Sequence, residues 1–346
     1  MELAKELIFL VLGFVYLAKG SDWLVEGGSA LANRMGIRQL VIGLTVVAWG
    51  TSAPELVVST LAAVDGKSSI AMGNVLGSNV ANIGLVLGIC AIILPSVLEK
   101  PLGMRDGFWF LASVGILWWV TRDLEIDRLD GLLLLGALAI YNFQLFREAQ
   151  GSSASCEGVE LPGEGSGWMA RNPAWGTLIG GVTIAVAAWI ALVGAKGLAF
   201  RAGVDDFVIG MTVMAIGTSL PELAAGVTGA LKKQSDISIG NVVGSNVFNL
   251  LAVIGVVAII HPLGGDGQPE VQLVLKRALE DQFPVVFGFT VAAVIVPTLG
   301  GARLGRLKGY LFFAAYAAFM AVIFIQGPEE ASPDGGVPVS SSQPLD

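Results

Sequence analysis

Hydrophobic residues form long runs in this sequence, separated by short polar segments. Runs that cross ~30 Å of hydrocarbon as helices need about 20 apolar residues, and ten runs reach or approach that length. The predicted spans are Leu7–Leu31, Leu40–Ala63, Ile70–Leu94, Phe108–Val120, Leu132–Phe146, Thr177–Phe200, Phe207–Leu231, Ile237–Ile260, Phe283–Leu299 and Leu307–Ile325. The pattern predicts an all-α integral membrane protein.

Two of the spans contain almost the same polar phrase. The second span holds Gly50-Thr51-Ser52-Ala53-Pro54-Glu55, and the seventh holds Gly217-Thr218-Ser219-Leu220-Pro221-Glu222. Proline breaks a helix, and a carboxylate within a membrane span usually has a functional role. A single Ser, Thr or Pro in a span is commonly structural, but the duplication favours a functional interpretation.

The duplication extends well beyond this phrase at one fixed offset of 167 residues, the difference between 222 and 55. The offset holds without a gap from Gly36 and Gly203 to Gly88 and Gly255. Its polar matches include Gly73-Asn74-Val75 with Gly240-Asn241-Val242, Gly77-Ser78-Asn79-Val80 with Gly244-Ser245-Asn246-Val247, and Asn82 with Asn249. Because polar positions repeat while apolar ones vary, shared membrane composition does not explain the match.

Five spans in each half, an odd number, would place the halves in opposite senses across the membrane. We therefore expect two inverted five-helix repeats, with broken helices meeting at the midplane. The first repeat covers residues 1–147 and the second covers 176–326. Between them, 148–175 is rich in Gly, Ser and Glu and predicts a flexible cytoplasmic linker, and 327–346 predicts a disordered tail.

Composition narrows the functional classes. Of 346 residues, 54% are hydrophobic and 14% charged, whereas a soluble protein has about 25% charged residues. The net charge of −8 arises largely in the linker and tail, and no basic patch with interleaved aromatics suggests nucleic-acid binding. Two cysteines and one histidine suggest neither a disulfide framework nor a histidine metal site. We expect no cofactor. The lipid bilayer is an expected partner, and no obligatory protein partner is inferred.

Lysine and arginine in the loops give an orientation. Eleven fall in loops on one predicted side and seven on the other, so the first side is assigned to the cytoplasm. Both termini then lie outside it. The N-terminus lacks a cationic start and a cleavage site, so the first span is expected to be a retained helix.

The repeated phrases supply oxygen ligands. Backbone carbonyls around Ala48–Thr51 and Ala215–Thr218 are expected to lose helical partners at the prolines. Hydroxyl groups and two carboxylates would lie at the same level, contributed by Thr51, Ser52, Thr218, Ser219, Glu55 and Glu222. Hard oxygen ligands without sulfur or imidazole suit Ca²⁺ or Na⁺.

The second motif predicts a facing wall. Asn74, Ser78 and Asn82 lie four residues apart on one helical face, as do Asn241, Ser245 and Asn249. Glycine pairs in the same segments, Gly73 with Gly77 and Gly240 with Gly244, would let two backbones approach closely. Asp22 and Glu26, by contrast, have no acidic counterparts in the second half and are interpreted as interfacial, with a gating role left open.

Gly-Thr-Ser-x-Pro-Glu-Leu followed by Gly-Asn-x-x-Gly-Ser-Asn-x-x-Asn, present twice, resembles the Ca²⁺/cation antiporter superfamily, and within it the bacterial calcium/sodium antiporters. The resemblance implies ten helices in a bacterial inner (plasma) membrane, four central ion sites and exchange of Na⁺ for Ca²⁺ by alternating access. It implies that Glu55 and Glu222 are central Ca²⁺ ligands. Further ligands would be the Thr51 and Thr218 carbonyls, the Ser52 and Ser219 hydroxyls, the Ala48 and Ala215 carbonyls, Ser78, Ser245, Asn82 and Asn249.

One position departs from part of that family. Some relatives have an acid where this chain has Asn249, and in the potassium-dependent group an Asp there is linked to a K⁺ requirement. With Asn at both positions, the site has two formal charges, which one Ca²⁺ neutralises. This argues against K⁺ co-transport and favours occupancy by either Ca²⁺ or Na⁺.

Other functions remain open from the sequence. A Ca²⁺/H⁺ antiporter could use the same site, because both glutamates can take protons. An intramembrane hydrolase would need a nucleophile with a base or a histidine metal motif, but the only histidine, His261, lies near the end of a span. A structural or receptor role would predict no ion flux. The sequence therefore favours a transporter over an enzyme.

Overall fold

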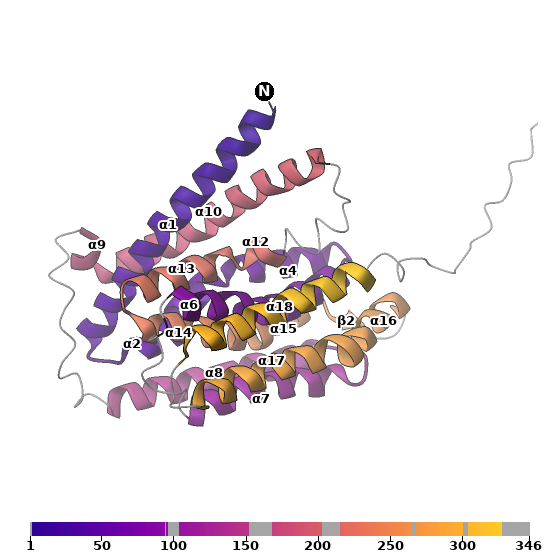
Figure 1. Cartoon of the computed structure of the whole chain (residues 1–346). Coiled ribbons are helices and arrows are strands. Elements are labelled where there is room, and N and C mark those ends of the chain that lie inside the picture. Colours follow the sequence, from indigo (N-terminus) through magenta and orange to yellow (C-terminus); the bar gives the residue numbers. More distant parts are fainter. Residues whose placement is uncertain are drawn as a thin grey trace, which may run out of the picture.

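Helices make up nearly all of the computed structural model, which describes residues 2–93, 95, 104–151, 168–202, 215–264, 268–299 and 304–326 (Figure 1). The first half contains α1 (Glu2–Met35), α2 (Gln39–Ile42), the π-helical turn η1 (Gly43–Val47), α3 (Ala48–Thr51), α4 (Ala53–Val64), α5 (Ser68–Ala81), the π-helical turn η2 (Asn82–Leu87), α6 (Gly88–Ile93), α7 (Met104–Thr121), β1 (Glu125–Ile126), α8 (Arg128–Gly151) and α9 (Trp168–Arg171).

The second half contains the matching series of elements. These are α10 (Pro173–Arg201), α12 (Ala215–Thr218), α13 (Leu220–Leu231), α14 (Ser235–Phe248), the π-helical turn η4 (Asn249–Val253), α15 (Ile254–Ile260), β2 (Leu263–Gly264), α16 (Pro269–Arg277), the π-helical turn η5 (Ala278–Gln282), α17 (Phe283–Ile295), the 3₁₀ turn η6 (Val296–Thr298) and α18 (Arg306–Gln326).

Among the described residues, seven continuous helices are long and apolar enough to cross a membrane, which confirms an integral membrane protein of helical class. An eighth span forms if Gln39–Thr51 and Ala53–Val64, which meet at an angle of 44°, count as one broken helix. The other two predicted spans correspond to α7 and to α12 with α13, which are not among the helices long and apolar enough to cross a membrane. Ten spans in two inverted repeats therefore stay a prediction.

Several helices extend beyond the predicted spans. The helix that includes α8 begins at Arg128 and ends at Gly151, and the one that includes α17 begins at Pro269. Part of the predicted linker is therefore helical, as α9 also shows, whereas 152–167 and the predicted tail 327–346 lie outside the described residues. Hydropathy detects the apolar part of a helix and misses its charged ends, where long side chains reach the interface.

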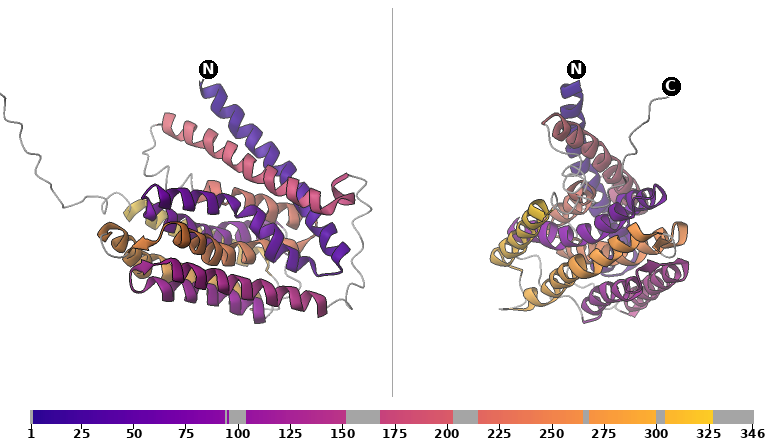
Figure 2. Two further views of the ribbon diagram at one scale, coloured as in Figure 1. Left: turned by 180° about the vertical axis from the view of Figure 1, so that it is seen from behind. Right: turned by 90° about the vertical axis from the view of Figure 1, so that its right-hand side faces the viewer.

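Helices α1 and α10 pack against each other over most of their length, at an angle to the remaining helices (Figures 1 and 2). They run antiparallel, because Gly13 approaches Ala191 while Gly27 approaches Thr177. A Cβ atom on Gly27 would lie 2.4 Å from the Thr177 nitrogen, and one on Gly180 would lie 2.4 Å from the Leu24 nitrogen. Glycine is therefore required where these two backbones cross.

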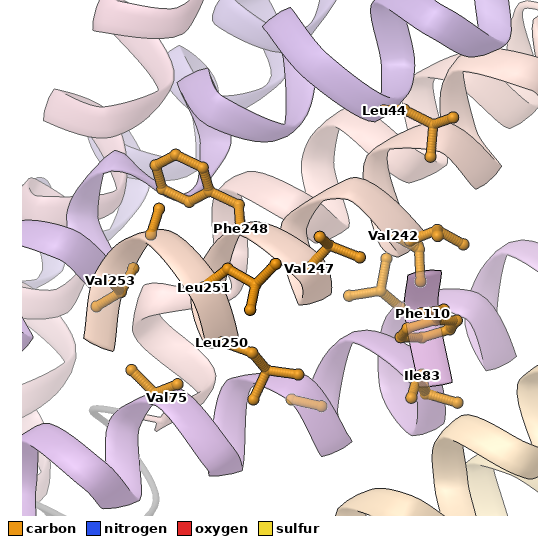
Figure 3. Packing of buried hydrophobic residues seen from close by; sticks show 14 of the residues in the cluster. Leu44, Val75, Ile83, Phe110, Val242, Val247, Phe248, Leu250, Leu251 and Val253 are labelled. Carbon is orange, nitrogen blue, oxygen red and sulfur yellow. The ribbon is translucent and has the colours of Figure 1, made fainter. Parts of the chain in front are cut away.

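The two halves share one core, with α14 near its centre. Side chains of α14 and η4, among them Val242, Val247 and Leu251, lie close to Leu44 and Val75 of the first half (Figure 3). All five of these side chains are buried.

The glycine pair of α14 allows this close packing. A Cβ atom on Gly240 would lie 2.8 Å from the Cα atom of Gly43, and one on Gly244 would lie 2.4 Å from the Leu44 carbonyl oxygen. The predicted close approach is confirmed for this pair. At Gly73 and Gly77 an added Cβ would meet nothing within 4 Å in the described part of the chain.

A short antiparallel pairing joins the two halves at one end of the bundle, where β1 pairs with β2 through Glu125 opposite Gly264 and Ile126 opposite Leu263. Leu124 and Gly264 have φ angles of 63° and 85°. An added Cβ on Gly264 would lie 2.4 Å from the Leu124 carbonyl oxygen, so glycine is required there. The hydrophobic pattern did not predict this pairing, because two-residue strands have no detectable period.

Candidate ion-binding site

Both duplicated phrases form a helix break at the serine. Between α3 and α4, Ser52 has φ −88° and ψ 6°, and Ser219 between α12 and α13 has φ −84° and ψ 2°. Pro54 and Pro221 follow in the first turn of the next helix, where a missing N–H leaves no helical bond unmade. The predicted breaks are confirmed at both sites.

The expected loss of the Ala48 carbonyl's helical partner is wrong. This carbonyl accepts the Ser52 backbone N–H at 3.0 Å and lies 3.2 Å from the Thr51 hydroxyl oxygen. The helix keeps its hydrogen bonding up to Ser52, because the N–H that Pro54 lacks would have faced Gly50 instead. Ala215, the equivalent residue, begins α12 as the structure describes it.

Glu55 and Glu222 are completely buried in the first turns of α4 and α13. The Ser52 hydroxyl, from the other half, donates to Glu222 Oε1 at 2.8 Å. Glu222 Oε2 and both carboxyl oxygens of Glu55 have no hydrogen-bond partner among the described residues. Helix N-termini favour negative charge, so each break suits its acid.

Threonine and asparagine connect the two halves in a mirrored way. The Thr51 hydroxyl donates to Asn241 Oδ1 at 2.9 Å, and the Thr218 hydroxyl donates to Asn74 Oδ1 at 3.1 Å. Each asparagine amide also points to the backbone carbonyl of its own glutamate, with Asn74 Nδ2 3.5 Å from Glu55 O and Asn241 Nδ2 3.3 Å from Glu222 O. Asn74 therefore positions Thr218 and Glu55, and Asn241 positions Thr51 and Glu222.

The serines of the second motif join the same contacts. Ser245 Oγ lies 3.3 Å from the Thr51 hydroxyl oxygen, and Ser78 Oγ lies 3.4 Å from that of Thr218. Both serines are completely buried. The structure thus brings the Thr51 and Ser245 hydroxyl groups together, next to Ser52 at the end of α3. Thr218 and Ser78 form the equivalent pair. The prediction of a facing wall is confirmed for these residues.

Asn82 and Asn249 occupy equivalent positions, at the first residues of the π-helical turns η2 and η4. Both are completely buried, and none of their side-chain amide atoms has a hydrogen-bond partner among the described residues. Turn η4 packs against α4, which holds Glu55, and η2 packs against α13, which holds Glu222. A π-helical turn inside an α-helix is often a functional site. Apart from the repeated asparagine, no pattern in the sequence predicts these turns.

Eight buried side-chain atoms of the predicted ligand set lack partners in the part of the chain that the structure describes. They are both carboxyl oxygens of Glu55, Glu222 Oε2, Ser219 Oγ, and the Oδ1 and Nδ2 atoms of Asn82 and Asn249. A buried polar atom without a partner is rare and costs about 1–3 kcal/mol. Six of the eight are oxygens, so a hard cation would satisfy most of them.

The site has only two acids. Among the described residues, no cluster of three or more His, Cys, Asp or Glu could hold a metal ion. A transition-metal centre therefore finds no ligand set there, whereas neutral oxygens with two carboxylates suit Ca²⁺ and Na⁺.

Asp22 and Glu26 have a partner that the sequence did not predict. Lys232, just after α13, places its Nζ atom 3.1 Å from Asp22 Oδ1 and 2.6 Å from Glu26 Oε1. Nearby, the Ser21 and Thr228 hydroxyl oxygens lie 2.7 Å apart. These contacts fix α1 against α13, so the two acids belong to a helix interface.

Comparisons with known proteins agree with this architecture. The sodium/calcium exchanger protein family matches residues 5–147 and 172–325. A putative antiporter, CaxA of Alkalimonas amylolytica, is 35% identical over 92% of this chain and 98% of its own length. The sodium/calcium exchanger MaX1 of Methanosarcina acetivorans is 30% identical over 92% and 98%.

A solved structure shows the same fold. The sodium-calcium exchanger NCX_Mj, soaked with Na⁺ and Sr²⁺, superposes with a TM-score of 0.76 at 28% identity, covering 92% of this chain and 98% of that one. Sequence and structure agree over both halves, and the chain belongs to the sodium/calcium exchanger protein family.

Proposed function

We propose that this protein exchanges Na⁺ for Ca²⁺ across the membrane, with Glu55 and Glu222 as shared ligands of both ions. The observation that carries the proposal is the pair of completely buried glutamates, three of whose four carboxyl oxygens lack a protein partner among the described residues. Buried charges are retained when they pair with other charges, and a transported cation would supply that charge.

Charge balance supports alternating occupancy. Two carboxylates neutralise one Ca²⁺, whereas several Na⁺ ions would exceed the negative charge unless bound by neutral oxygens. Asn82 and Asn249 offer such oxygens, as does Ser219. Binding of either Ca²⁺ or Na⁺ in one site couples their movements, which is the requirement for exchange.

The family also supports the transport geometry. We propose ten helices in two inverted repeats, with both termini outside the cytoplasm of a bacterial cell. Antiparallel packing of α1 and α10, whose glycines Gly13 and Gly180 match at the 167-residue offset, supports opposite orientations of the halves. A midplane site between such repeats can open to either side in turn.

Flux into proteoliposomes tests the proposal. Vesicles loaded with Na⁺ and diluted into low-Na⁺ buffer should accumulate Ca²⁺, and vesicles without the Na⁺ gradient should not. Uptake that ignores Na⁺ but follows a proton gradient would instead establish Ca²⁺/H⁺ antiport.

Substitutions test the ligands. Glu55→Gln and Glu222→Gln should each lower Na⁺-driven Ca²⁺ uptake to the level of empty vesicles, because either one removes half the negative charge of the site. Glu280→Gln, at an exposed position in η5, serves as the matched control and should transport normally. Normal flux in either buried-site variant would disprove the assignment.

A further inference from the structure

A cavity of about 380 Å³ lies between α17 and α18, away from the ion-binding site. Its walls are apolar and include Gly288, Phe289 and Ala292 of α17 and Leu311, Phe312 and Ala315 of α18. Pockets for small ligands have volumes of about 300–1,000 Å³, and this one is within that range. The two helices run along the same outer face of the bundle (Figure 1).

Both helices that line the α17–α18 cavity also pack against the π-helical turn η2. A Cβ atom on Gly84, within η2, would lie 2.5 Å from the Tyr316 Cβ atom and 3.0 Å from Phe289 Cε1. The helices that line the cavity are therefore in contact with the turn that begins with Asn82.

One end of the cavity is cationic. Lys308 precedes Leu311 and Phe312 by three and four residues, so it lies on the same face of α18. Its ammonium group donates to the Pro297 and Leu299 carbonyls beyond the end of α17. These bonds keep the positive charge of Lys308 at this end of the cavity. Arg306, two residues earlier, is exposed. The other end, before α17, has the acidic residues Glu280 and Asp281 instead.

We propose that the α17–α18 cavity binds one anionic phospholipid, with an acyl chain along the apolar walls and the phosphate beside Lys308 and Arg306. The bilayer supplies acyl chains to this face, and an apolar cavity cannot hold water, which needs polar partners. A cation near a membrane surface attracts anionic lipid. The site is independent of the proposed ion exchange, because it uses none of the ion-binding residues.

Native mass spectrometry of the full-length protein in detergent tests the proposal. Phosphatidylglycerol and phosphatidylcholine with identical acyl chains are the two probes. We expect one retained phosphatidylglycerol and weaker retention of phosphatidylcholine, by about fivefold for each of the two cations. Arg306→Gln should lower that preference about fivefold without affecting folding, because its side chain is exposed.

Filling the cavity should displace the lipid. A Cβ atom added at Gly288, which lines the cavity, would meet nothing within 4 Å among the described residues. Gly288→Phe therefore fills the cavity from its wall and should abolish retention of phosphatidylglycerol. Gly115→Phe, on the exposed side of α7 with equally open surroundings, is the matched control and should retain it.

Three results would overturn the proposal. They are equal retention of both phospholipids by the unsubstituted protein, unchanged retention in Gly288→Phe, and a dimer that Gly288→Phe converts to a monomer. The last would identify a second copy of the chain as the occupant. None depends on transport, so each is separate from a failure of Na⁺/Ca²⁺ exchange.

Discussion

The Ser52 hydroxyl of the first half donates to Glu222 at 2.8 Å, whereas the equivalent hydroxyl of the second half, Ser219 Oγ, has no partner among the described residues. In contrast, the threonine–asparagine contacts of the two halves are mirrored, at 2.9 Å and 3.1 Å. The supporting contacts thus repeat, while the contacts of the acids themselves differ. Glu55 is left with more unsatisfied oxygen atoms than Glu222.

A second difference lies behind the acids, where α4 meets α5 and α13 meets α14. In the first half the Ser59 hydroxyl, on α4, donates to the Ala71 carbonyl on α5. In the second half the hydroxyl is on the other helix, where Ser238 of α14 donates to the Gly226 carbonyl of α13. These positions match at the 167-residue offset. A bond between the same two helices therefore persists although its donor has changed sides.

The largest expected effect compares two positions of α10 that face α1, one without and one with a side-chain methyl group. Gly180→Val should lower the free energy of unfolding by about 3 kcal/mol or more, because even a Cβ atom would lie 2.4 Å from the Leu24 nitrogen. Ala187, which matches Gly20 of α1, already has a methyl group. Ala187→Gly should therefore cost only about 1 kcal/mol. Thermal unfolding in detergent measures both losses of stability. Similar losses in Gly180→Val and Ala187→Gly would contradict the close approach of α10 to α1 at Gly180.

The two break serines should differ in stability. Ser52→Ala removes the donor to Glu222 and should destabilise the ion-free protein by about 1.5–3 kcal/mol. Ser219→Ala removes an unpartnered oxygen and should leave stability unchanged or slightly higher. Thermal unfolding without Ca²⁺ or Na⁺ is the measurement. Equal destabilisation by both substitutions would show that the asymmetry does not exist in solution.

The two asparagines of η2 and η4, by contrast, should behave alike. Asn82→Ala and Asn249→Ala should each weaken Ca²⁺ binding about tenfold, or about 1.4 kcal/mol, without lowering stability in the absence of ions. Isothermal titration of purified protein measures the affinity. Asn142→Ala, which removes a bond to the Leu138 carbonyl in α8, is a control that should not change it. An effect at only one of the two positions would mean that the halves contribute unequally.

The smallest effect concerns the ion pairs of Lys232, which have no equivalent at the matching position of the first half among the described residues. Lys232 pairs with Asp22 and Glu26 of α1, but its counterpart at the 167-residue offset is Asp65. Lys232→Gln should cost no more than about 1 kcal/mol, because all three side chains are partly exposed. The loss should shrink at high salt. Lys67→Gln, at an exposed position, is the control, and thermal unfolding at low and high ionic strength is the measurement.

Much of the fold could be predicted because membrane spans and an internal repeat leave strong patterns in a sequence. The helix breaks at Ser52 and Ser219 followed from proline chemistry, and the mirrored contacts of Thr51 and Thr218 followed from the repeat. The ligand roles of Glu55 and Glu222 and the order of the ten spans stay predictions.

The features that could not be predicted depend on where a helix ends and on distances between helices. The Ala48 carbonyl was expected to be free, but a helix continues to the last residue whose N–H can reach back, here Ser52. Lys232 could not be paired with Asp22 from sequence, because the partners are far apart in the chain. Glycines seven residues apart in α1 (Gly13, Gly20 and Gly27) were a usable sign of the crossing with α10 that the hydrophobic pattern conceals.

The hydrogen bonds between halves also have a consequence for biosynthesis. Thr51 bonds to Asn241 and Ser245, residues that the ribosome adds long after the first half has been made. A nascent first half therefore enters the bilayer without the partners that Thr51 and Asn74 have in the folded protein. Water or the insertion machinery must accommodate these two side chains until the second half arrives. Chains truncated after residue 147 should accordingly be degraded rapidly in cells.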